Sequence, residues 1–255
     1  MRADVLSGRH AIVTGASRGI GAAIAARLAE AGAATILIGR DATALADRER
    51  QIPNSRSVVC DVTDAAQVEK VYSELLAHAQ VDILVNNAGA AESAPFAKTS
   101  DSMLERMLSV NLHSAFRCSR AVLPAMLARG YGRIVNISSI AGLRGYPYVT
   151  AYVAAKHALV GFSRALAMEL AQKGITVNAV CPGYTDTELV RGAASAISAK
   201  TGRSEGDVVR EMIRTNPLGR LIRAEEIAET VAWLCGPESD SITGQAIAVA
   251  GGEIM

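Results

Sequence analysis

Aromatic side chains are scarce in this chain of 255 residues, at 4% with a single tryptophan, and neither sign of charge is in excess. The 26 lysines and arginines are set against 25 acidic residues, with no basic block or stripe, which disfavours nucleic-acid binding. No apolar run approaches the ~20 residues of a membrane span. The short polar N-terminus does not have the pattern of a signal peptide. We therefore expect a soluble, cytoplasmic protein that neither crosses a membrane nor binds nucleic acid.

Cysteine clusters are also absent. The four cysteines, Cys60, Cys118, Cys181 and Cys235, are scattered among apolar neighbours, without a CxxC motif or a nearby group of histidines. This spacing excludes the usual zinc-binding patterns and is typical of buried thiols in a reducing compartment. We expect neither a metal site nor a disulfide.

Half of the residues are apolar, which is enough for one large α/β domain or two small ones. Short, almost continuously apolar runs alternate with helical patterns, as in a parallel sheet covered on both faces. No linker, repeat or low-complexity tract divides the chain, so we expect a single doubly wound domain over residues 1–255. The predicted strands lie at 11–13, 35–38, 57–60, 82–85, 133–137, 175–180 and 245–249. The first predicted helix ends near residue 31. The others lie at 42–50, 65–79, 102–129, around residue 152 and at 224–235.

Tyr152 and Lys156 stand four residues apart in an alanine-rich stretch that predicts a helix. Residues at this spacing share one helix face, so the phenol and the ammonium can point into one site. A nearby positive charge lowers the pKa of a tyrosine from its ordinary value of ~10. A phenol tuned in this way can exchange a proton in catalysis. The alternative is a tyrosine and a lysine that share a helix by chance.

A glycine-rich turn joins the first predicted strand to the first helix. Gly15, Gly19 and Gly21 have the spacing G-x3-G-x-G. Pyrophosphate needs a backbone that can approach closely and the free N–H groups of a helix start, and both are expected here. We interpret the turn as a dinucleotide site; the alternative is a glycine-rich turn without a ligand.

The end of the second strand favours NADP(H) over NAD(H). An acidic residue there would bind the ribose 2′-hydroxyl, whereas a basic one accommodates a 2′-phosphate. The strand ends in Gly39-Arg40, with Asp41 only after the arginine, and Arg18 lies in the glycine turn. Two guanidiniums could hold a phosphate through their forked N–H groups. Alternatively, both are solvated surface arginines.

Together these motifs resemble the short-chain dehydrogenase/reductase family. The resemblance covers residues 6–252 and implies a Rossmann-type fold in which one domain binds cofactor and substrate. It is carried by the segment 14–21, Asn86-Asn87-Ala88-Gly89, Asn111, Ser139, Tyr152-x-x-x-Lys156 and Pro182-Gly183, in the family's order and spacing.

The resemblance implies four catalytic residues. Tyr152 corresponds to the acid/base, and Lys156 to the lysine that lowers its pKa and binds the nicotinamide ribose. Ser139, thirteen residues before the tyrosine, corresponds to the catalytic serine in preference to Ser138. Asn111 corresponds to the asparagine that holds a water in the proton relay. The expected reaction is hydride transfer between NADP(H) and a carbonyl carbon, with no metal.

The same resemblance implies a cofactor-binding set drawn from the whole chain. Asn86, Asn87 and Ser138 could instead be structural hydrogen-bonding residues. The expected set is Gly15, Ser17, Arg18, Gly19, Ile20, Gly21, Arg40, Asp61, Val62, Asn87, Ala88, Gly89, Tyr152, Lys156, Pro182, Gly183 and Thr187.

Substrate identity rests on the segment 184–218, which we expect to act as a lid with short helices at 193–200 and 208–214. The tract 174–183 resembles 3-oxoacyl thioester reductases and polyketide ketoreductases, and the longer lid resembles hydroxybutyrate or hydroxyacyl-CoA dehydrogenases. We expect a 3-oxoacyl or 3-hydroxyacyl substrate. The alternatives are a small cyclic or aryl ketone and, in another class, an NADP(H) sensor without turnover. The resemblance also implies a homotetramer built through the long helix at 102–129, the helix around residue 152 and the C-terminal strand, with the apolar ending 251–255 compatible with burial at such an interface.

Overall fold

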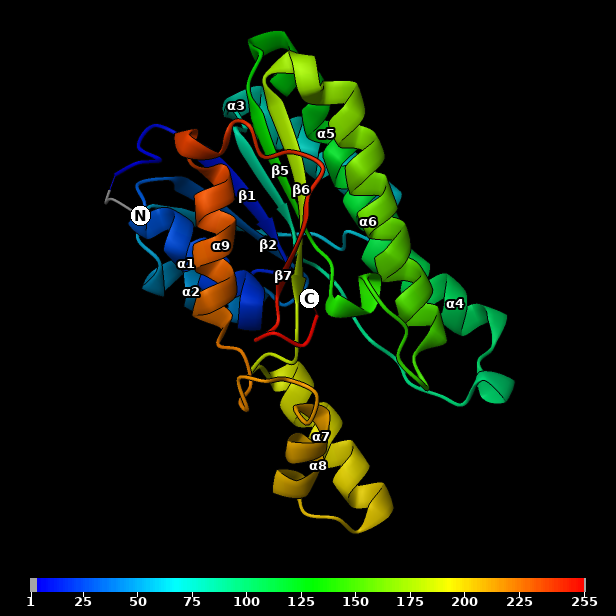
Figure 1. The fold of residues 1–255 in the computed structure, drawn as a ribbon. Coiled ribbons are helices and arrows are strands. Elements are labelled where there is room, and N and C mark those ends of the chain that lie inside the picture. The colour runs from blue at the N-terminus through cyan, green and yellow to red at the C-terminus, as the bar shows by residue number, and fades with distance from the viewer. Residues whose placement is uncertain (1–3, 255) are drawn as a thin grey trace.

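In the computed structural model, which describes residues 4–254, the strands form a single parallel sheet in the order β3-β2-β1-β4-β5-β6-β7. The strand order reverses between β1 and β4, as in a doubly wound fold, and the predicted Rossmann-type class is confirmed (Figure 1). Residues 1–3 and 255, which belong to the predicted polar start and apolar ending, lie outside the described part of the chain. The strands are β1 His10–Thr14, β2 Ala34–Gly39, β3 Ser55–Val59, β4 Ile83–Asn86, β5 Gly132–Ile137, β6 Ile175–Pro182 and β7 Ala246–Val249.

Helices cover both faces of the sheet. One face carries α1 (Gly19–Glu30), α2 (Ala42–Gln51) and α9 (Ala224–Cys235), whose apolar residues share one core cluster. The other carries α3 (Ala65–His78), α5 (Ser114–Arg129) and α6 (Thr150–Leu170), which share a second.

The strand β1 shows why the apolar runs are continuous. Ala11 and Val13 belong to the first cluster, whereas Ile12 between them belongs to the second. Successive strand residues point to opposite faces, so a sheet with two covered faces needs apolar side chains at every position.

The helix predicted over 102–129 is interrupted. It consists of α4 (Asp101–Leu108), a π-helical turn at Ser109–His113, and α5. The π turn contains Asn111, and such turns occur mainly at functional sites. The hydrophobic pattern of this region did not predict the interruption.

The lid helices begin earlier than predicted, at α7 (Glu188–Thr201) and α8 (Glu205–Met212). Thr187 Oγ1 accepts a bond from Val190 N, and Ser204 Oγ accepts one from Asp207 N, so each helix starts directly after its cap. The predicted starts are too late because they were taken from the apolar pattern, which does not include the capping residues Thr187 and Ser204.

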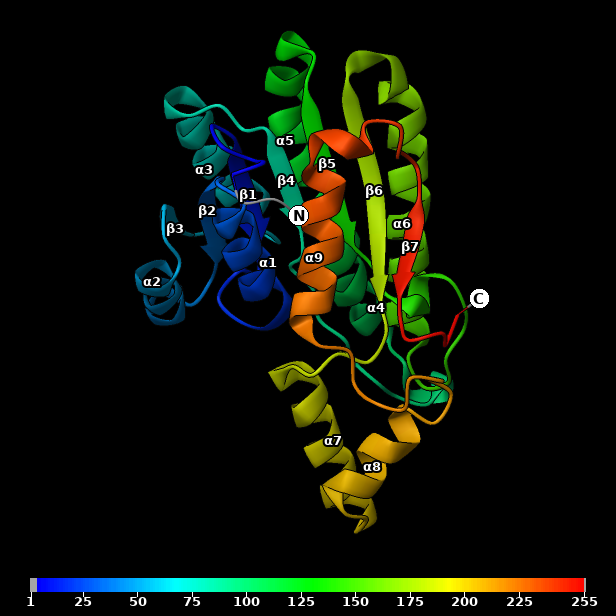
Figure 2. The same ribbon diagram turned by 60° about the vertical axis from the view of Figure 1, so that its left-hand side comes forward.

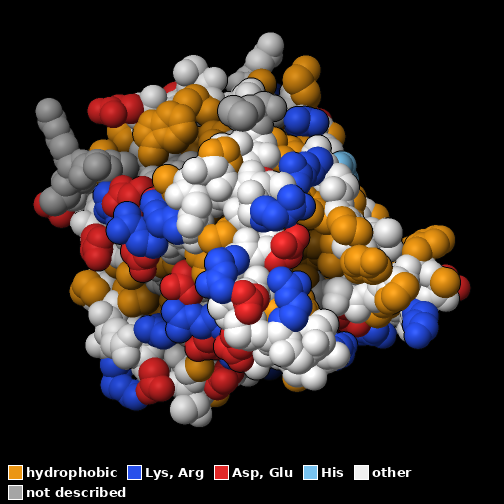
Figure 3. Space-filling view, turned by 60° about the horizontal axis from the view of Figure 1, so that its bottom comes forward, with side chains coloured by type: hydrophobic (Ala, Val, Ile, Leu, Met, Phe, Trp, Pro, Cys, Tyr) orange, Lys and Arg blue, Asp and Glu red, His pale blue; other side chains and the backbone are white. Residues whose placement is uncertain are grey.

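The lid projects from the body beyond the carboxyl ends of the strands, where α7 and α8 lie side by side (Figures 1 and 2). Its neck is a parallel bridge between Thr185 and Ile222. On this end of the molecule, acidic and basic side chains are interspersed rather than segregated (Figure 3).

Two sequence expectations concern the fold as a whole. All four cysteines are buried and free, as predicted. None of the helices within residues 4–254 has the length and apolar character needed to cross a membrane.

Candidate active site

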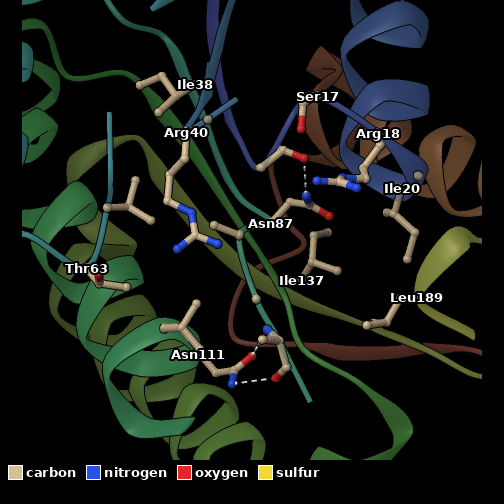
Figure 4. A pocket seen from close by; sticks show the side chains of 18 of the residues that line it. Ser17, Arg18, Ile20, Ile38, Arg40, Thr63, Asn87, Asn111, Ile137 and Leu189 are labelled. Carbon is tan, nitrogen blue, oxygen red and sulfur yellow. Dashed lines mark hydrogen bonds between the residues drawn. The ribbon is translucent and has the colours of Figure 1, made fainter. Parts of the chain in front are cut away.

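A cavity of about 640 Å³ opens at the carboxyl ends of the strands, where the strand order reverses. Its wall is built from the glycine turn, the ends of β2 and β3, the loop after β4, and the start of α7 (Figure 4). Most of the predicted cofactor-binding residues line it. Those in the wall are Gly15, Ser17, Arg18, Gly19, Ile20, Arg40, Asp61, Val62, Asn87, Ala88, Gly89, Tyr152, Lys156 and Thr187.

The glycine turn is held too tightly for any side chain. Gly15 has a φ of +66°, and a Cβ there would lie 2.9 Å from Asn87 Nδ2. A Cβ on Gly21 would lie 2.3 Å from Gly15 O, although Gly21 itself does not line the cavity. Asn87 Nδ2 donates to the carbonyls of Thr14 and Gly15, at 3.0 and 3.2 Å, and fixes the turn from the β4 side.

The first turn of α1 is free of competing groups. Arg18 is its N-cap and makes no side-chain capping bond, and the turn contains no acidic residue. The partial positive charge of the helix start therefore faces the cavity wall uncompensated, which suits a phosphate group.

Two arginines approach the cavity from opposite sides (Figure 4). Arg40 Nη1 lies 3.7 Å from Asp61 Oδ2, and Arg18 Nη1 lies 3.1 Å from Glu188 Oε2 on the lid. The two guanidiniums do not form a common clamp; each is paired with a carboxylate. The Arg40 side chain is 77% exposed, so its pairing with Asp61 is weak and exchangeable.

The two acidic residues beside Arg40 have distinct roles. Asp41 caps α2, with its Oδ1 accepting a bond from Ala44 N at 3.0 Å. Burial acts to raise the pKa of Asp61, but hydrogen bonds from Thr63 and the charge of Arg40 outweigh it, and the pKa is lowered. Asp61 is thus a fixed anionic acceptor at the end of β3.

Tyr152 and Lys156 lie on one face of α6 and both line the cavity, as predicted from their spacing. Lys156 is 4% exposed, and its Nζ donates to Ile137 O at 2.9 Å and lies 5.7 Å from the centre of the Tyr152 ring. Burial lowers the pKa of Lys156 to about 8.

The predicted lowering of the tyrosine pKa is wrong for this arrangement. Burial raises the pKa of Tyr152 above its ordinary value, and the opposing hydrogen bond comes from Ser139, not from Lys156. The lysine ammonium is occupied by a backbone carbonyl and is itself desolvated, so it does not dominate the electrostatics of the phenol.

The two neighbouring serines after β5 have different partners. Ser138 is buried, and its Oγ donates to Lys156 O at 3.1 Å. The Ser139 hydroxyl accepts a bond from Ala141 N at 3.1 Å and acts on Tyr152. Ser138 therefore anchors α6, whereas Ser139 stands beside the phenol.

Some predicted residues lie outside the cavity wall. Ser139 is one of them, although Tyr152, beside which it stands, lines the cavity. Pro182 and Gly183 are also outside it. Gly183 packs on the C-terminal segment instead, where a Cβ would lie 3.1 Å from Ala250.

Asn111 joins the π turn to the loop after β4. Its Nδ2 donates to Ala90 O at 2.9 Å and to Met107 O at 3.0 Å, and its Oδ1 accepts from Ala90 N at 3.3 Å. Gly89 lies against it: a Cβ there would be 2.8 Å from Asn111 Oδ1 and 3.5 Å from Lys156 Nζ. Asn111 thereby holds the cavity wall close to the lysine, and its bonds are drawn in Figure 4.

Asn86 is structural. Its Nδ2 donates to Asn136 Oδ1 at 2.8 Å and Ser119 Oγ at 3.1 Å, and Asn136 Nδ2 donates to Ser163 Oγ at 2.8 Å. This buried network ties β4 and β5 to α5 and α6, away from the cavity wall.

Sequence reasoning missed two supports of the glycine turn. Thr14 Oγ1 accepts bonds from the backbone N–H groups of Asn87 and Ala88, both at 3.0 Å. Arg48 on α2 donates from Nε to Ser17 O at 3.2 Å. These contacts join distant parts of the chain, so no local pattern indicates them.

A second cavity of about 380 Å³ lies between α7 and the loop after β4, and shares Glu188 and Leu189 with the first. Its wall combines apolar residues of α7 with the polar side chains of Ser93, Glu188 and Lys200. Its remaining residues are Ala91, Gly192, Ala193, Ala196 and Ile197.

Comparison with known proteins gives consistent matches along the chain. Residues 9–198 match the family described as short chain dehydrogenase. The 3-oxoacyl-acyl-carrier-protein reductase FabG of Escherichia coli (strain K12) is 39% identical over 255 residues, covering 97% of this chain and 98% of that protein. The D-beta-hydroxybutyrate dehydrogenase of Rhizobium meliloti (strain 1021) is 35% identical over 255 residues, covering 96% and 98%. Among solved structures, an actinorhodin polyketide ketoreductase variant with NADPH has a TM-score of 0.92 and 36% identity, covering 99% of each chain.

Proposed function

Because this chain belongs to the short-chain dehydrogenase family, we propose that it is an NADP(H)-dependent oxidoreductase that interconverts a ketone and a secondary alcohol. The substrate class is a 3-oxoacyl or 3-hydroxyacyl thioester. The observation that carries the proposal is the placement of Tyr152 and Lys156 in the wall of the main cavity, with Ser139 beside the phenol.

The cavity fits a dinucleotide. The glycine turn excludes side chains at Gly15 and Gly21, and the uncapped start of α1 suits a pyrophosphate. Asp61, Val62 and the segment 87–89 line the cavity, and we assign the adenosine of the cofactor to them. When bound, NADPH would supply the hydride of the reduction.

The 2′-phosphate of NADP(H) is proposed to lie between Arg40 and Arg18. Both arginine side chains are exposed, and each is paired with one carboxylate, Asp61 for Arg40 and Glu188 for Arg18. Ion pairs of exposed arginines are weak, so a phosphate can displace these carboxylates at little cost. The similar actinorhodin ketoreductase variant was solved with NADPH, which supports the choice of NADP(H) over NAD(H).

Residues of the chain itself supply the proton for the substrate oxygen and stabilise the negative charge that develops on it. The raised pKa of Tyr152 keeps its phenol protonated at neutral pH, so Oη can give a proton to the substrate oxygen. The Ser139 hydroxyl donates a hydrogen bond to the same oxygen and stabilises the negative charge that develops on it. Lys156 Nζ, with a pKa of about 8, can supply the proton that restores the phenol. Asn111 keeps the loop after β4 in place beside Nζ.

The second cavity supports an acyl substrate. Leu189, Ala193 and Ile197 on α7 give it an apolar wall that continues from the main cavity. We assign the acyl chain to this groove and the lid function to residues 184–218. A small cyclic or aryl ketone is the second candidate substrate. It ranks below the acyl thioester because it would leave most of the groove unused.

The direct test is NADPH oxidation with a 3-oxoacyl thioester, followed by absorbance, in wild type and Tyr152→Phe. The variant loses one hydroxyl, so its fold and NADPH affinity should persist, whereas kcat should fall by about 10²–10⁴-fold, the scale of a positioned acid. A kcat within threefold of wild type would remove Tyr152 from its role. NADPH binding by wild type without turnover of any ketone would indicate the sensor instead.

A homotetramer in the cytoplasm is part of the proposal. Phe116, Leu127 and Met168 expose apolar surface on α5 and α6, the helices expected at the subunit interface. The four free, buried thiols are compatible with a reducing compartment. Light scattering measures the assembly directly, and a monomeric mass would contradict the tetramer.

A further inference from the structure

A buried carboxylate near the C-terminus takes no part in the reaction proposed above. Glu253 follows β7, and its side chain is 1% exposed. Its Oε1 accepts bonds from Tyr146 Oη at 2.8 Å, Thr215 Oγ1 at 3.0 Å and Arg144 Nη2 at 3.4 Å. Its Oε2 is buried without a partner. Burying a carboxylate with one unpaired oxygen costs free energy, so we expect Glu253 to have a role that offsets this cost.

The donors to Glu253 come from two separate functional segments. Arg144 and Tyr146 lie in the loop that joins Ser139 to Tyr152. Thr215 lies just after α8, where the chain leaves the lid. A single carboxylate therefore connects the loop between two proposed catalytic residues to the exit of the lid.

The backbone of the C-terminal segment strengthens the same connection. Leu218 N donates to Gly251 O at 3.1 Å. Gly251 has a φ of +62°, and a Cβ there would lie 2.3 Å from Asn216 Oδ1. Figure 2 shows the end of the chain turning back beside the segment that joins α8 to α9. The C-terminal segment is thus the surface against which the lid exit rests.

Tyr184 lies within electrostatic reach of both Glu253 and Tyr152. Burial and then the charge of Glu253 raise the pKa of Tyr184, at the entry to the lid. Tyr184 in turn contributes, after burial, to the raised pKa of Tyr152.

The loop itself is under strain. Tyr148 has a φ of +66°, a left-handed conformation that non-glycine residues rarely adopt. Its carbonyl accepts a bond from Ala94 N at 2.8 Å. A strained backbone persists only where its surroundings hold it, and the bonds from Arg144 and Tyr146 to Glu253 do so four and two residues away.

We propose that Glu253 is a positioning residue that couples the lid to the Ser139–Tyr152 loop. With Thr215 and Tyr146 bound to one oxygen, the exit of the lid and the loop beside the substrate carbonyl move together. Glu253 touches neither the cofactor cavity nor the reacting atoms. The inference rests on the proposed reductase function, because it assigns the lid to the substrate side of the same site.

The kinetic test compares Glu253→Ala and Glu253→Gln with Glu238→Gln, a matched loss of an exposed carboxylate in the turn after α9. In Glu253→Ala, KM for the 3-oxoacyl thioester should rise about tenfold or more, because all three hydrogen bonds to Oε1 are lost. KM for NADPH should stay within about twofold, since the cofactor cavity is untouched. Glu253→Gln keeps an accepting oxygen and should recover most of the loss. A loss shared equally by both substrates, or no rescue by glutamine, would overturn the proposal.

Two milder variants guard against a general folding defect. Tyr146→Phe and Thr215→Val each remove one donor hydroxyl to Glu253. Each should raise KM for the thioester by itself and add little in the Glu253→Ala background, because both act through the same carboxylate. Full additivity in the double variants would contradict a shared role.

A measurement without substrate separates this inference from the proposed function. Trypsin cleavage of the lid, which contains Arg191, Lys200, Arg203, Arg210 and Arg214, is followed with NADPH present. Measured well below the Tm of each protein, cleavage should be about tenfold faster in Glu253→Ala than in wild type or Glu238→Gln. Equal cleavage rates would refute the coupling even in an active enzyme. Faster cleavage in a protein without ketone turnover would refute only the proposed function.

Discussion

Two adjacent hydroxyls at the end of β5 show how strongly a residue's role depends on direction. Ser138 points into the protein and bonds the Lys156 carbonyl inside α6, whereas Ser139 faces Tyr152. Successive residues that leave a strand point to opposite sides, so only one of the pair can serve the substrate. The same geometry gives the other serine a structural task.

Replacing each serine with alanine should therefore impair a different property, catalysis for Ser139 and stability for Ser138. Ser139→Ala should lower kcat by about 10²–10³-fold, the usual effect of removing a donor to a developing oxyanion, with little change in stability. Ser138→Ala should reduce the free energy of unfolding by about 1 kcal/mol, because a buried hydrogen bond is lost, while kcat changes only a few-fold. Urea unfolding and NADPH oxidation measure the two quantities. Similar losses of kcat in both variants would contradict the choice of Ser139.

Cofactor preference is also decided by single residues. Arg40→Ala should raise KM for NADPH by about tenfold or more and leave KM for NADH nearly unchanged, because only NADPH carries the phosphate. Gly39→Asp should invert the preference by adding an acceptor for the ribose and a repulsion against the phosphate. A Cβ at Gly39 lies 3.4 Å from Leu45 Cδ2, so only a small adjustment is needed.

The matched control for the cofactor variants is Arg50→Ala, which removes an exposed arginine from α2, the helix that follows Arg40, outside the cavity wall. The measurement is kcat/KM for both cofactors in each protein. If wild type prefers NADH, or if Arg40→Ala weakens both cofactors equally, the arginines are surface residues and the NADP(H) assignment is wrong.

At the scale of elements, the start of α1 depends on β4. Asn87 holds the glycine turn from the loop after β4, and Gly21 lets the helix pack against that turn. The π turn between α4 and α5 works in a similar way, since Asn111 bonds the same loop further along. Both sides of the cavity therefore rest on residues 87–90.

Gly21→Ala should disturb this packing. The added methyl group would approach Gly15 O and Asn87 Nδ2 far inside van der Waals contact, at 2.3 and 2.4 Å. We expect a loss of about 1–3 kcal/mol in stability, as for other overpacked sites, and at least about tenfold weaker NADPH binding because the turn must move.

The control for Gly21→Ala is Gly206→Ala in the exposed helix α8, where the nearest atom to an added Cβ is Arg210 Nη1 at 3.8 Å. It should bind NADPH like wild type and be as stable or up to about 1 kcal/mol more stable, since alanine favours a helix. Fluorescence titration with NADPH and urea unfolding distinguish the two variants. Unimpaired NADPH binding in Gly21→Ala would exclude a tight turn.

For the molecule as a whole, the buried lysine links catalysis to stability. The pKa of Lys156 falls from 10.5 to about 8 on folding, because burial disfavours the charged form. Between these values the unfolded chain binds more protons than the folded one, so this residue makes stability increase with pH. Below about pH 8, Lys156 is charged in both the folded and the unfolded protein. The full free-energy cost of burying its charge therefore lowers the stability there.

Replacing Lys156 with methionine should therefore stabilise the protein at pH 7, by at most about 3 kcal/mol. The advantage over wild type should shrink as the pH rises from about 8 and vanish above about 10.5. Urea unfolding of both proteins across this range gives the difference directly, and the subtraction removes the titration of all other groups. A difference that is independent of pH would contradict the lowered pKa of the lysine.

The sequence by itself determined the alternation of strands and helices, the parallel sheet, the glycine turn and the shared helix face of Tyr152 and Lys156. These features are local: they depend on hydrophobic period, glycine spacing and the helical repeat, which neighbouring residues set among themselves.

The tertiary structure alone decided which partners those residues meet. The Lys156 ammonium bonds Ile137 O, and burial, more than the lysine, sets the pKa of Tyr152. Asn111 stabilises a π turn by reaching Ala90, and Glu253 joins the lid exit to the Ser139–Tyr152 loop. Each of these contacts joins segments far apart in the chain, and pKa values depend on burial in the assembled core. No pattern of neighbouring residues carries that information, because it arises only when the sheet brings the carboxyl ends of its strands together.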